Sequence, residues 1–535
     1  MATTDVNAGQ DLQAALDAAQ PGDTLRLDAA GTWSADYLLP VKSGDGQITI
    51  TTSNLETLPL AGNRVTEEQS LALPRIKGHI KTMPRSSHYT FRGVRIEAYA
   101  DYYTGGLVDF GGQGINNDIV VNVAEDLPRD FTIDRCWLAA DPGWGGKRGV
   151  YANCAGFIIR DSVVKDFFSD SQDSQAIGCT NGPGPFIVEN CYLSATGENI
   201  MFGGACPSIP GLVPSDITVR HCWLHKPESW RAQKAQREDL VSASRLHLVR
   251  HPRRPGLYRL KSYNYAVKNL FELKNAKNVR VENCILEGCW SDAQAGFAVQ
   301  LTVRTCEAGN YDWATVSDVL IQNCLIISEC GINVLGTDGA RDNCPPPPTA
   351  GTAYNLVFRN NDVRASWCWQ IMSEAHDILI ERNSCDHNYG AMMAFDSVPG
   401  AEMMTRLKVQ GNRFSFGSGI AGSGAGPGSQ ALDMYFDEWL FAGNAIHSVP
   451  TSEMWWIADG TGNWYPADNL YTDATTPPSG YGCDSAALEQ ALKHVRDGQG
   501  AGNPVPPPAG SATLEVREAL PPGSYEVVPR DMEML

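Results

Sequence analysis

A ten-residue pattern recurs along most of the chain. The stretch "VENC" occurs twice, at Val188–Cys191 and Val281–Cys284, and apolar residues follow each copy. The wider pattern has three strand-like positions, a polar pair, a small residue and two further positions that are often apolar. Its eleven copies begin at Tyr89, Phe131, Phe157, Phe186, Ile217, Val279, Val319, Leu356, Ile378, Leu407 and Trp439. Their unequal spacing indicates a repeat array with insertions.

Each copy is too short to bury its own apolar face, so neighbouring copies must stack. Parallel strands about 4.8 Å apart would place the same position of successive copies in line. The sixth position is occupied in turn by Val94, Cys136, Ser162, Cys191, Cys222, Cys284, Cys324, Asn361, Asn383, Asn412 and Asn444. We expect these side chains to point inward, the thiols as small apolar fillers and the amides as a hydrogen-bonded ladder.

Composition agrees with a soluble protein rich in β structure. The 52 Gly and 32 Pro among 535 residues imply many turns, and a hydrophobic content of 43% supports a large core. The 15 Cys are an odd number and lack zinc-type CxxC spacing, so most are expected to be reduced and buried. A net charge of −19 argues against nucleic acid as a partner.

The sequence contains no evident targeting or membrane segment. The start "MATTDVNAGQDLQAALDAAQ" lacks the basic and apolar regions of a secretory signal. No later stretch reaches the length of a membrane span. We therefore expect a soluble chain that is synthesised in a cytoplasm and, in one interpretation below, ends in a virion.

Several stretches resemble proteins of known architecture. The segment "LQAALDAAQPGDTLRL" looks like the cap helix, turn and first strand that open many right-handed parallel β-helix proteins of the pectin-lyase-like superfamily. Leu12, Leu16 and Ala19 lie on one face of that helix. The stretches "GPGPFIVENCYLSATGENIMFGG", "PSDITVRHCWLHKP" and "KNLFELKNAKNVRVENCILEG" are similar to bacterial β-helix repeat proteins. The resemblance implies an all-β fold, a single-stranded right-handed parallel β-helix (solenoid) with an N-terminal cap helix and a C-terminal cap and tail.

The expected organisation has three parts. Residues 1–30 form the cap helix and first strand, and residues 31–446 form the β-helix. Residues 447–535 form a C-terminal cap, a Pro-rich linker and a tail, with a short helix whose N-cap is Asp484 or Ser485. An insertion at about 229–262 holds nine Lys or Arg against two acidic residues. It is either a solvated excursion or a docking arm for an acidic neighbour such as a second copy in a homo-oligomer.

The resemblance places a functional groove on the outer face of the stacked strands. Two stretches echo each other there, "QDSQA" with Asp173 and Gln175, and "SDAQA" with Asp292 and Gln294. Between them lies "ATGENIMFGG", which adds Glu198. Carboxylates that converge on one groove can act as acid and base, or as nucleophile and acid, on a glycosidic bond. Asp173, Glu198 and Asp292 are the candidate catalytic residues, and the alternative is that they brace turns.

A polysaccharide lyase would need different chemistry. Its base would be a Lys or Arg, and a second cation or a metal such as calcium would neutralise the uronate carboxylate; no other cofactor is expected. Trp residues could stack on sugar rings. The candidate substrate-binding residues are Gln175, Asn199, Trp223, Lys268, Lys274, Trp290, Gln294 and Arg304.

Two classes of function fit these features. The first is a protein that binds, and as a lyase or glycoside hydrolase cleaves, a polysaccharide along the groove. The second is a noncatalytic virion structural or receptor-binding protein, such as a phage tailspike, fibre or capsid decoration, with other virion proteins as partners. The missing export signal favours the second class, and the absence of an evident N-terminal head-binding domain argues against it.

Overall fold

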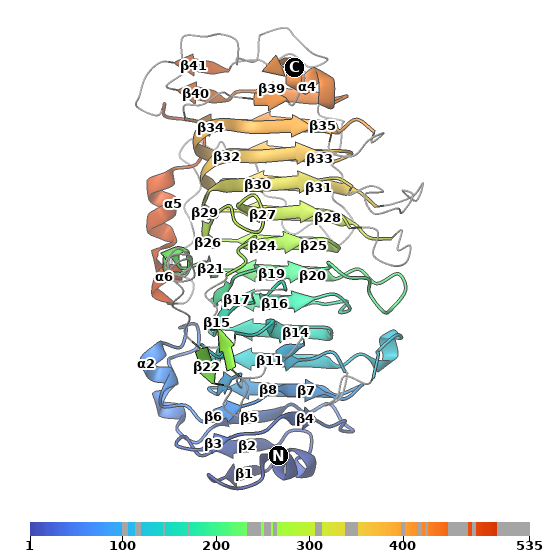
Figure 1. The fold of residues 1–535 in the computed structure, drawn as a ribbon, viewed down its shortest axis with the longest axis vertical. Coiled ribbons are helices and arrows are strands. Elements are labelled where there is room, and N and C mark those ends of the chain that lie inside the picture. Colours follow the sequence, from blue (N-terminus) through green and yellow to red (C-terminus); the bar gives the residue numbers. More distant parts are fainter. Residues whose placement is uncertain are drawn as a thin grey trace. The chain divides into compact units, whose positions relative to one another are not determined.

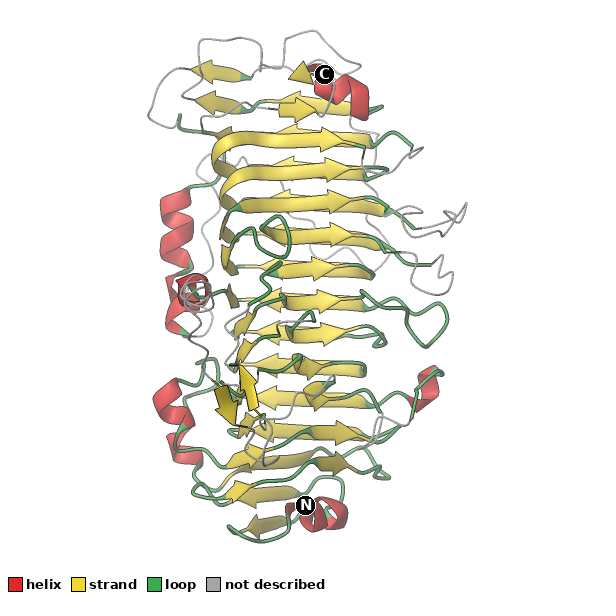
Figure 2. Cartoon of the chain, viewed as in Figure 1, coloured by secondary structure: helices red, strands yellow, loops and turns green. Residues whose placement is uncertain are grey.

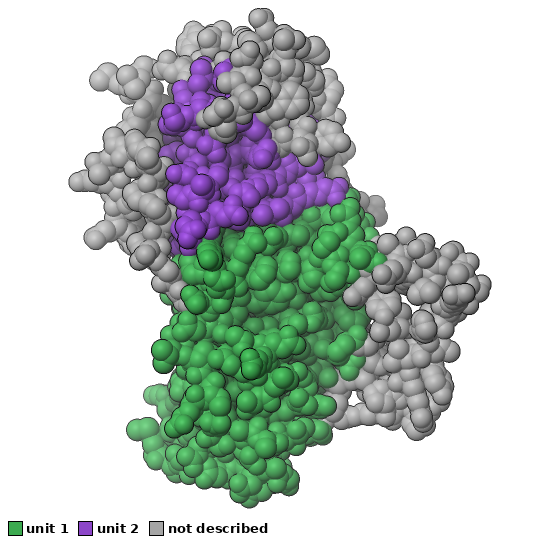
Figure 3. Space-filling model, turned by 90° about the vertical axis from the view of Figure 1, so that its left-hand side faces the viewer, with its two compact units in different colours: residues 1–273, 284–299, 492–503 green, residues 274–283, 300–491, 504–535 purple. Residues whose placement is uncertain are grey.

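The structure is a computed structural model of the chain. It describes residues 1–98, 105–112, 119–142, 145–169, 172–232, 248–250, 258–260, 265–304, 313–337, 351–396, 402–415, 420–422, 426–427, 429–447, 469–472 and 478–499. The chain forms two compact units, which are treated separately below (Figure 3). Unit 1 holds residues 1–273, 284–299 and 492–503, and unit 2 holds residues 274–283, 300–491 and 504–535.

Unit 1 is built from three columns of strands in which each strand pairs in parallel with its equivalent in the next coil (Figures 1 and 2). Column 1 holds β1 (Thr3–Val6), β2 (Thr24–Leu27), β5 (Ile48–Thr52), β8 (Ser87–Arg92), β11 (Arg129–Asp134), β14 (Ala155–Arg160), β17 (Phe186–Glu189) and β20 (Ser215–Arg220). Column 2 holds β3 (Thr32–Trp33), β6 (Arg75–Lys77), β9 (Arg95–Glu97), β12 (Trp137–Ala139), β15 (Val163–Phe167), β18 (Tyr192–Ala195), β21 (Trp223–His225) and β26 (Ile285–Cys289). Column 3 holds β4 (Tyr37–Leu39), β7 (Ile80–Thr82), β10 (Gly106–Asp109), β13 (Arg148–Tyr151), β16 (Gln175–Cys179), β19 (Glu198–Phe202) and β24 (Phe271–Leu273).

Unit 2 repeats this plan with longer strands. Its first column holds β25 (Ala276–Glu282), β28 (Val316–Gln322), β31 (Ala353–Arg359), β33 (His376–Glu381), β35 (Thr405–Gln410) and β39 (Trp439–Ala442). The other faces are formed by β29 (Leu325–Ser328), β30 (Cys330–Leu335), β32 (Asp362–Met372), β34 (Ser384–Phe395), β36 (Arg413–Phe414), β37 (Ile420–Gly422), β38 (Gly426–Pro427), β40 (Ala445–His447) and β41 (Leu470–Thr472). β27 (Phe297–Thr302) contains the sequence boundary between the units. The expected parallel β-helix is confirmed.

A left-handed residue ends the first strand of every repeat. The fifth position of the ten-residue pattern has a φ between 48° and 64° in all eleven copies, at Gly93, Arg135, Asp161, Asn190, His221, Asn283, Asn323, Asn360, Arg382, Gly411 and Gly443. Gly, Asn and Asp tolerate this conformation best, which explains the polar pair of the pattern. The bend turns the chain out of its strand, so that the sixth residue starts the next face of the coil.

The sixth position points inward, as predicted. All eleven of its side chains, from Val94 to Asn444, are fully buried. In unit 1 the thiols lie against backbone of neighbouring rungs, where Cys222 Sγ donates to the carbonyl of Val188 at 3.4 Å and accepts from the amide of Cys191 at 3.4 Å. Burial raises the pKa of Cys136 to about 12, so this thiol remains protonated and unreactive.

Unit 2 contains the predicted amide ladder. The Nδ2 of Asn361, Asn383 and Asn412 donates to the Oδ1 of the asparagine one rung further on, at 3.0, 3.0 and 2.9 Å. Asn444 donates in the same way to Asn469 at 3.2 Å, so the ladder extends beyond the last copy of the sequence pattern. Every rung thereby satisfies the buried amide of its neighbour.

The outward fourth position of unit 1 alternates in charge along column 1. Arg92, Asp134, Arg160, Glu189 and Arg220 are successive cross-strand partners. Their ion pairs include Arg92 with Asp134 at 3.0 Å and Arg220 with Glu189 at 2.9 Å. Ion pairs with partly exposed members add little stability one by one, but a one-residue slip would move every member to the other face. The alternation therefore helps to fix the strand register.

The helices lie at the ends and sides of the units. α1 (Leu12–Ala18) buries Leu12 and Leu16, as predicted for an N-terminal cap helix. The predicted C-terminal helix is present as α5 (Ser485–Ala491), where Asp484 Oδ1 accepts from the amide of Ala487 at 3.0 Å, followed by α6 (Lys493–Asp497). The other helical segments are α2 (Glu67–Ser70), α4 (Ser429–Tyr435) and the 3-10 turns η1 (Leu55–Thr57) and η2 (Ala124–Asp126).

The predicted basic insertion falls mainly outside the described residues. Within it the structure describes residues 229–232 and an antiparallel strand pair, β22 (Leu248–Arg250) and β23 (Tyr258–Leu260). Its proposed docking role remains a prediction. In the part of the chain that the structure describes, no helix is both long enough and apolar enough to cross a membrane.

Replacing Asn412 by Ala should lower the free energy of unfolding by about 1–3 kcal/mol, because the backbone amide and the Nδ2 of Asn383 both lose their buried acceptor. Denaturant titration measures the change. The Lys408→Ala variant is the control, since Lys408 lies on β35 in the same rung with its side chain partly exposed and should change stability by less than about 0.5 kcal/mol. Equal losses in the two variants would contradict the ladder's contribution.

Candidate functional site

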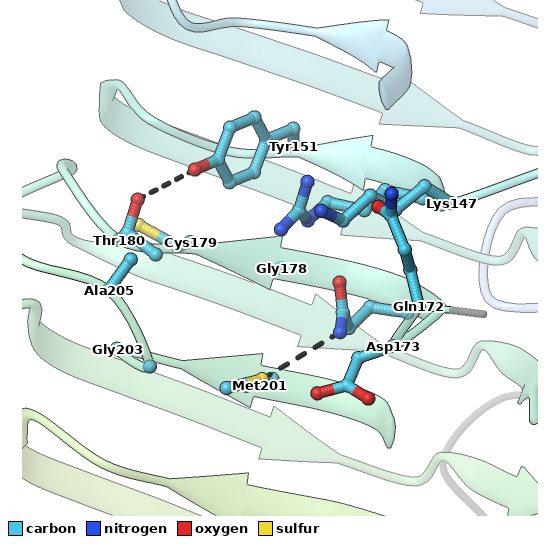
Figure 4. A pocket seen from close by; sticks show the side chains of 13 residues that line it. Lys147, Tyr151, Gln172, Asp173, Gly178, Cys179, Thr180, Met201, Gly203 and Ala205 are labelled. Carbon is cyan, nitrogen blue, oxygen red and sulfur yellow. Dashed lines mark hydrogen bonds between the residues drawn. The ribbon is translucent and has the colours of Figure 1, made fainter. Parts of the chain in front are cut away.

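A cleft of about 390 Å³ lies over column 3 of unit 1, on β13, β16 and β19. Its lining consists of Lys147, Arg148, Tyr151, Gln172, Asp173, Gln175, Gly178, Cys179, Thr180, Met201, Gly203, Gly204 and Ala205. Figure 4 shows Lys147, Gln172 and Asp173 toward one end, and Tyr151, Thr180 and Ala205 toward the other. The hydroxyls of Tyr151 and Thr180 are hydrogen-bonded at 2.7 Å.

The floor of the cleft is a gap in a row of side chains. Tyr151, Gly178 and Met201 are cross-strand partners on three successive rungs, and Gly178 contributes no side chain to this row. A Cβ added at Gly178 would lie 3.2 Å from Nε and 3.3 Å from Cδ of Arg148. Glycine here therefore leaves room for the Arg148 side chain in the cleft.

Two neighbouring cations line the cleft of this acidic protein. The Arg148 guanidinium carbon lies 4.2 Å from the centroid of the Tyr151 ring, a cation–π contact that fixes its position. Lys147 precedes it and is partly buried. Burial and the Arg148 charge lower the pKa of Lys147, and Asp173 opposes that shift only in part. A neutral amine is therefore accessible at lower pH than for an exposed lysine.

A chain of charged groups begins at the cleft wall and leads inward. Lys268 Nζ lies 2.6 Å from Asp173 Oδ1 and 3.9 Å from Glu198 Oε1. Burial disfavours the Lys268 ammonium, but the carboxylates of Glu198, Asp173 and Glu272 outweigh it and raise the pKa. Lys268 therefore carries its positive charge at neutral pH and joins two of the predicted catalytic residues.

Glu198 does not occupy the exposed position that the sequence predicted. It begins β19 beside its cross-strand partner Gln175, whose Nε2 donates to Glu198 Oε2 at 2.7 Å. The side chain is fully buried, and among the described residues its Oε1 has no hydrogen-bond partner. Burial, followed by the charges of Glu272 and Asp173, raises its pKa to about 8. Glu198 is thus mainly protonated at neutral pH, behind the cleft rather than in its lining.

Lys226 is a buried cation that sequence reasoning missed. Its Nζ donates to the carbonyls of Ala195 and Gly197, both at 2.7 Å, to that of Thr196 at 3.2 Å, and to Oδ1 of Asn199 at 3.1 Å. These contacts hold the turn that leads into β19. The only signal in the sequence was a Lys directly after a strand in "WLHK".

The Lys226 contact changes the interpretation of Asn199. This residue was predicted to bind substrate, but its side chain is fully buried. Its Nδ2 donates to the carbonyls of Leu193 at 2.7 Å and His225 at 3.1 Å. Asn199 is therefore an internal brace between β18 and β21, because a buried amide must find its partners within the protein.

The two predicted tryptophans do not line the cleft either. Trp290 is buried in an apolar cluster with Phe168, Trp230 and Tyr265. Trp223 donates from Nε1 to Glu287 Oε2 at 3.1 Å and stacks on His225. Both rings are held by packing within unit 1.

The remaining candidates lie apart from the cleft lining. Asp292 is exposed, and its Oδ2 accepts from the amide of Val267 at 2.9 Å, as a turn-bracing residue does. Gln294 is partly buried, and its carbonyl accepts from the amide of Asp292 at 3.0 Å. Lys274 and Arg304 belong to unit 2, where the Arg304 amide donates to the Lys274 carbonyl at 3.0 Å. The structure thus brings together Asp173, Gln175, Glu198 and Lys268.

Calcium would be expected here only if the protein were a lyase that uses a metal. The Lys268 ammonium already lies between the oxygens of Asp173 and Glu198, and a bound cation would compete with it. Among the described residues, no group of three or more His, Cys, Asp or Glu is arranged to hold a metal ion. These carboxylates therefore fit an internal ammonium better than a metal.

Comparison with known proteins finds similarity of fold only. No family model matches the sequence, and no curated protein matches it. Among solved structures, the PL6 family alginate lyase AlyGC is 11% identical with a TM-score of 0.45, and the match covers 95% of this chain and 59% of that lyase. The chain thus spans little more than half of that enzyme's length.

Two further solved structures illustrate the range of similar proteins. A mannuronic acid specific polysaccharide family 6 lyase from human gut microbiota is 10% identical with a TM-score of 0.43, over 93% of this chain and all of the lyase. The tailspike protein gp49 of Acinetobacter baumannii bacteriophage Fri1, a capsular polysaccharide depolymerase, is 8% identical with a TM-score of 0.31, over 87% of this chain and 59% of the tailspike. The parallel β-helix of this chain is shown by its own strand pairing.

Replacing Glu198 by Gln should make thermal stability less dependent on pH. Because the pKa of Glu198 rises from 4.5 to about 8 on folding, its contribution to stability is complete below pH 4.5 and is lost as the pH rises through 8. Between pH 5 and pH 8, the thermal unfolding midpoint of Glu198→Gln should therefore rise relative to that of the wild type. Thermal unfolding at each pH measures the two midpoints, with the exposed Glu125→Gln as control. A difference between Glu198→Gln and the wild type that stays constant with pH would contradict a buried, protonated Glu198.

Proposed function

We propose that this protein binds an anionic polysaccharide in the cleft and cleaves it by β-elimination. The proposal is carried by one observation, the placement of Lys147, whose pKa is lowered, directly beside the Arg148 guanidinium in a cleft of about 390 Å³. An amine that can be neutral and a permanent cation are the two groups that proton removal beside a uronate carboxylate requires.

Arg148 would hold the carboxylate of one sugar unit. A guanidinium pairs with a carboxylate in a bidentate geometry, and the stack on Tyr151 fixes the orientation of its plane. Gln172 and Asp173 line the same end of the cleft as Lys147 and would form hydrogen bonds with sugar hydroxyls. The Asp173 carboxylate would accept, and the Gln172 amide would donate or accept. Neutralising the carboxylate makes the proton on the adjacent ring carbon more acidic.

The reaction then needs two proton transfers. Neutral Lys147 removes the proton from C5 of the uronate, the C4–O4 bond breaks, and a C4=C5 double bond forms. The departing O4 oxygen takes a proton from the Tyr151 hydroxyl, which is hydrogen-bonded to Thr180. Solvent then removes the proton from Lys147 and returns one to Tyr151, which restores the starting state.

The buried charge chain keeps the cleft suitable for an anion. Because Glu198 keeps its proton, it adds no negative charge behind the substrate, and the charges of Asp173 and Lys268 cancel each other. A glycoside hydrolase mechanism is less well supported, because Glu198 lies outside the cleft lining and the Asp292 carboxylate accepts from a backbone amide. Lyase chemistry therefore accounts for more of the observed contacts.

The Lys147→Met variant should lower kcat/KM for polyuronate cleavage about 100-fold or more, because it removes the base. The assay follows the ultraviolet absorbance of the double bond that elimination creates. In the wild type, kcat/KM should rise with pH and level off below the usual lysine pKa of about 10.4, since the pKa of Lys147 is lowered. The residual activity of Lys147→Met should lack this rise.

The exposed Lys277→Met is the matched control and should retain wild-type kinetics. New reducing ends without ultraviolet absorbance would contradict elimination and favour a hydrolase. Polysaccharide binding without any product would contradict catalysis and leave the noncatalytic virion protein as the better interpretation.

A further inference from the structure

A second group of reactive side chains lies in unit 2, on the outer edge of its first column. Thr352 precedes β31, and His376 and Asp377 begin β33, the next strand of that column (Figure 1). The Thr352 Oγ1 lies 2.9 Å from His376 Nε2, and His376 Nδ1 lies 2.7 Å from Asp377 Oδ2. A hydroxyl, an imidazole and a carboxylate therefore form one continuous hydrogen-bonded chain.

The contacts of the imidazole select one tautomer. The Asp377 carboxylate accepts a hydrogen bond from the protonated Nδ1, which leaves Nε2 as the acceptor that faces the Thr352 hydroxyl. This is the arrangement in which a histidine can remove a proton from a nucleophile. The Tyr354 ring stacks on His376 at 5.2 Å with an interplanar angle of 4°, so the imidazole is held on its face as well as at its edge.

The carboxylate is held in its charged form by a neighbouring cation. Arg406 on β35 donates to Asp377 through Nε, and its Nη2 donates to Oδ2 at 2.7 Å. The Nη2 also lies 3.3 Å from His376 Nδ1. Burial opposes ionisation of Asp377, but the contacts with Arg406 and His376 outweigh it and lower the pKa of Asp377. The third member of the chain is therefore a fixed carboxylate.

We propose that Thr352, His376 and Asp377 form a second catalytic site, which hydrolyses small carboxylic esters through a covalent acyl-threonine. The site is accessible, because Thr352 is partly exposed and 27% of the His376 side-chain surface and 18% of that of Asp377 remain exposed. A nucleophile within reach of its base, and a base oriented by a carboxylate, is the geometric pattern of acyl-transfer sites.

The proposed reaction proceeds in two balanced steps. Thr352 Oγ1 attacks the ester carbonyl carbon while its proton passes to His376 Nε2, the ester C–O bond breaks, and the leaving alcohol takes that proton. Water then attacks the acyl-threonine, His376 again accepts a proton, and the carboxylic acid and the Thr352 hydroxyl are released. The site needs neither a metal nor the cleft of unit 1, so it does not depend on polysaccharide cleavage.

The first test is hydrolysis of p-nitrophenyl acetate by the full chain. Thr352→Val should lose about 100-fold or more of the wild-type rate above background, and Asp377→Asn should lose a similar factor because the tautomer is no longer fixed. Thr352→Ser should keep the activity. The matched control is Thr405→Val. Thr405 is the cross-strand partner of His376 on the next strand, and it does not belong to the hydrogen-bonded series of Thr352, His376 and Asp377.

The second test separates catalysis from a purely structural hydrogen bond. A fluorophosphonate should label the wild type and Thr352→Ser at residue 352, as located by peptide mass analysis, and should not label Thr352→Val. The thermal midpoint of each variant is compared with that of Thr405→Val to detect loss of folding. A wild-type chain that neither hydrolyses the ester nor takes the label, or a label at another residue, would overturn the proposal.

Discussion

The inward side chain of each rung depends on the neighbouring rung for its contacts, because no water reaches it. In unit 2 the Nδ2 of Asn383 donates to Asn412, which donates in turn to Asn444. In unit 1 thiols take this place and lie against backbone groups, as Cys222 does against Val188. A buried polar group without a partner costs about 1–3 kcal/mol, so each rung is stable only when the next one is in register.

The same rule governs the charges beside the cleft. Lys226 is buried because three carbonyls and one amide oxygen surround its ammonium group. Lys268 stays charged beside the Asp173 carboxylate, and Glu198 avoids the cost of a buried charge by keeping its proton. The region behind the cleft is therefore nearly neutral, and the two partly buried cations in the cleft lining, Lys147 and Arg148, set the sign of the field that a ligand meets.

Sequence reasoning found part of this site and missed part of it. Asp173 and Gln175 were selected because "QDSQA" echoes "SDAQA", and Glu198 because it lies between the two stretches. Lys268 was selected as a cation that a lyase would need, and the four residues do meet. The cations Lys147 and Arg148 were missed because β13 belongs to the third column, outside the ten-residue pattern. Trp290 was expected to bind substrate but is buried in an apolar cluster, because an aromatic residue after a strand can face either way until its neighbours are known.

The sequence by itself determined the rungs and the inward ladder, because these features repeat locally and every copy has the same backbone periodicity. It could not determine which outward residues meet. Loops of unequal length join the strands, so Lys268 reaches Asp173 only through the pairing of β24 with β19 and of β19 with β16. The protonation of Glu198 was decided by tertiary structure for the same reason, since it depends on burial and on charges that other rungs supply.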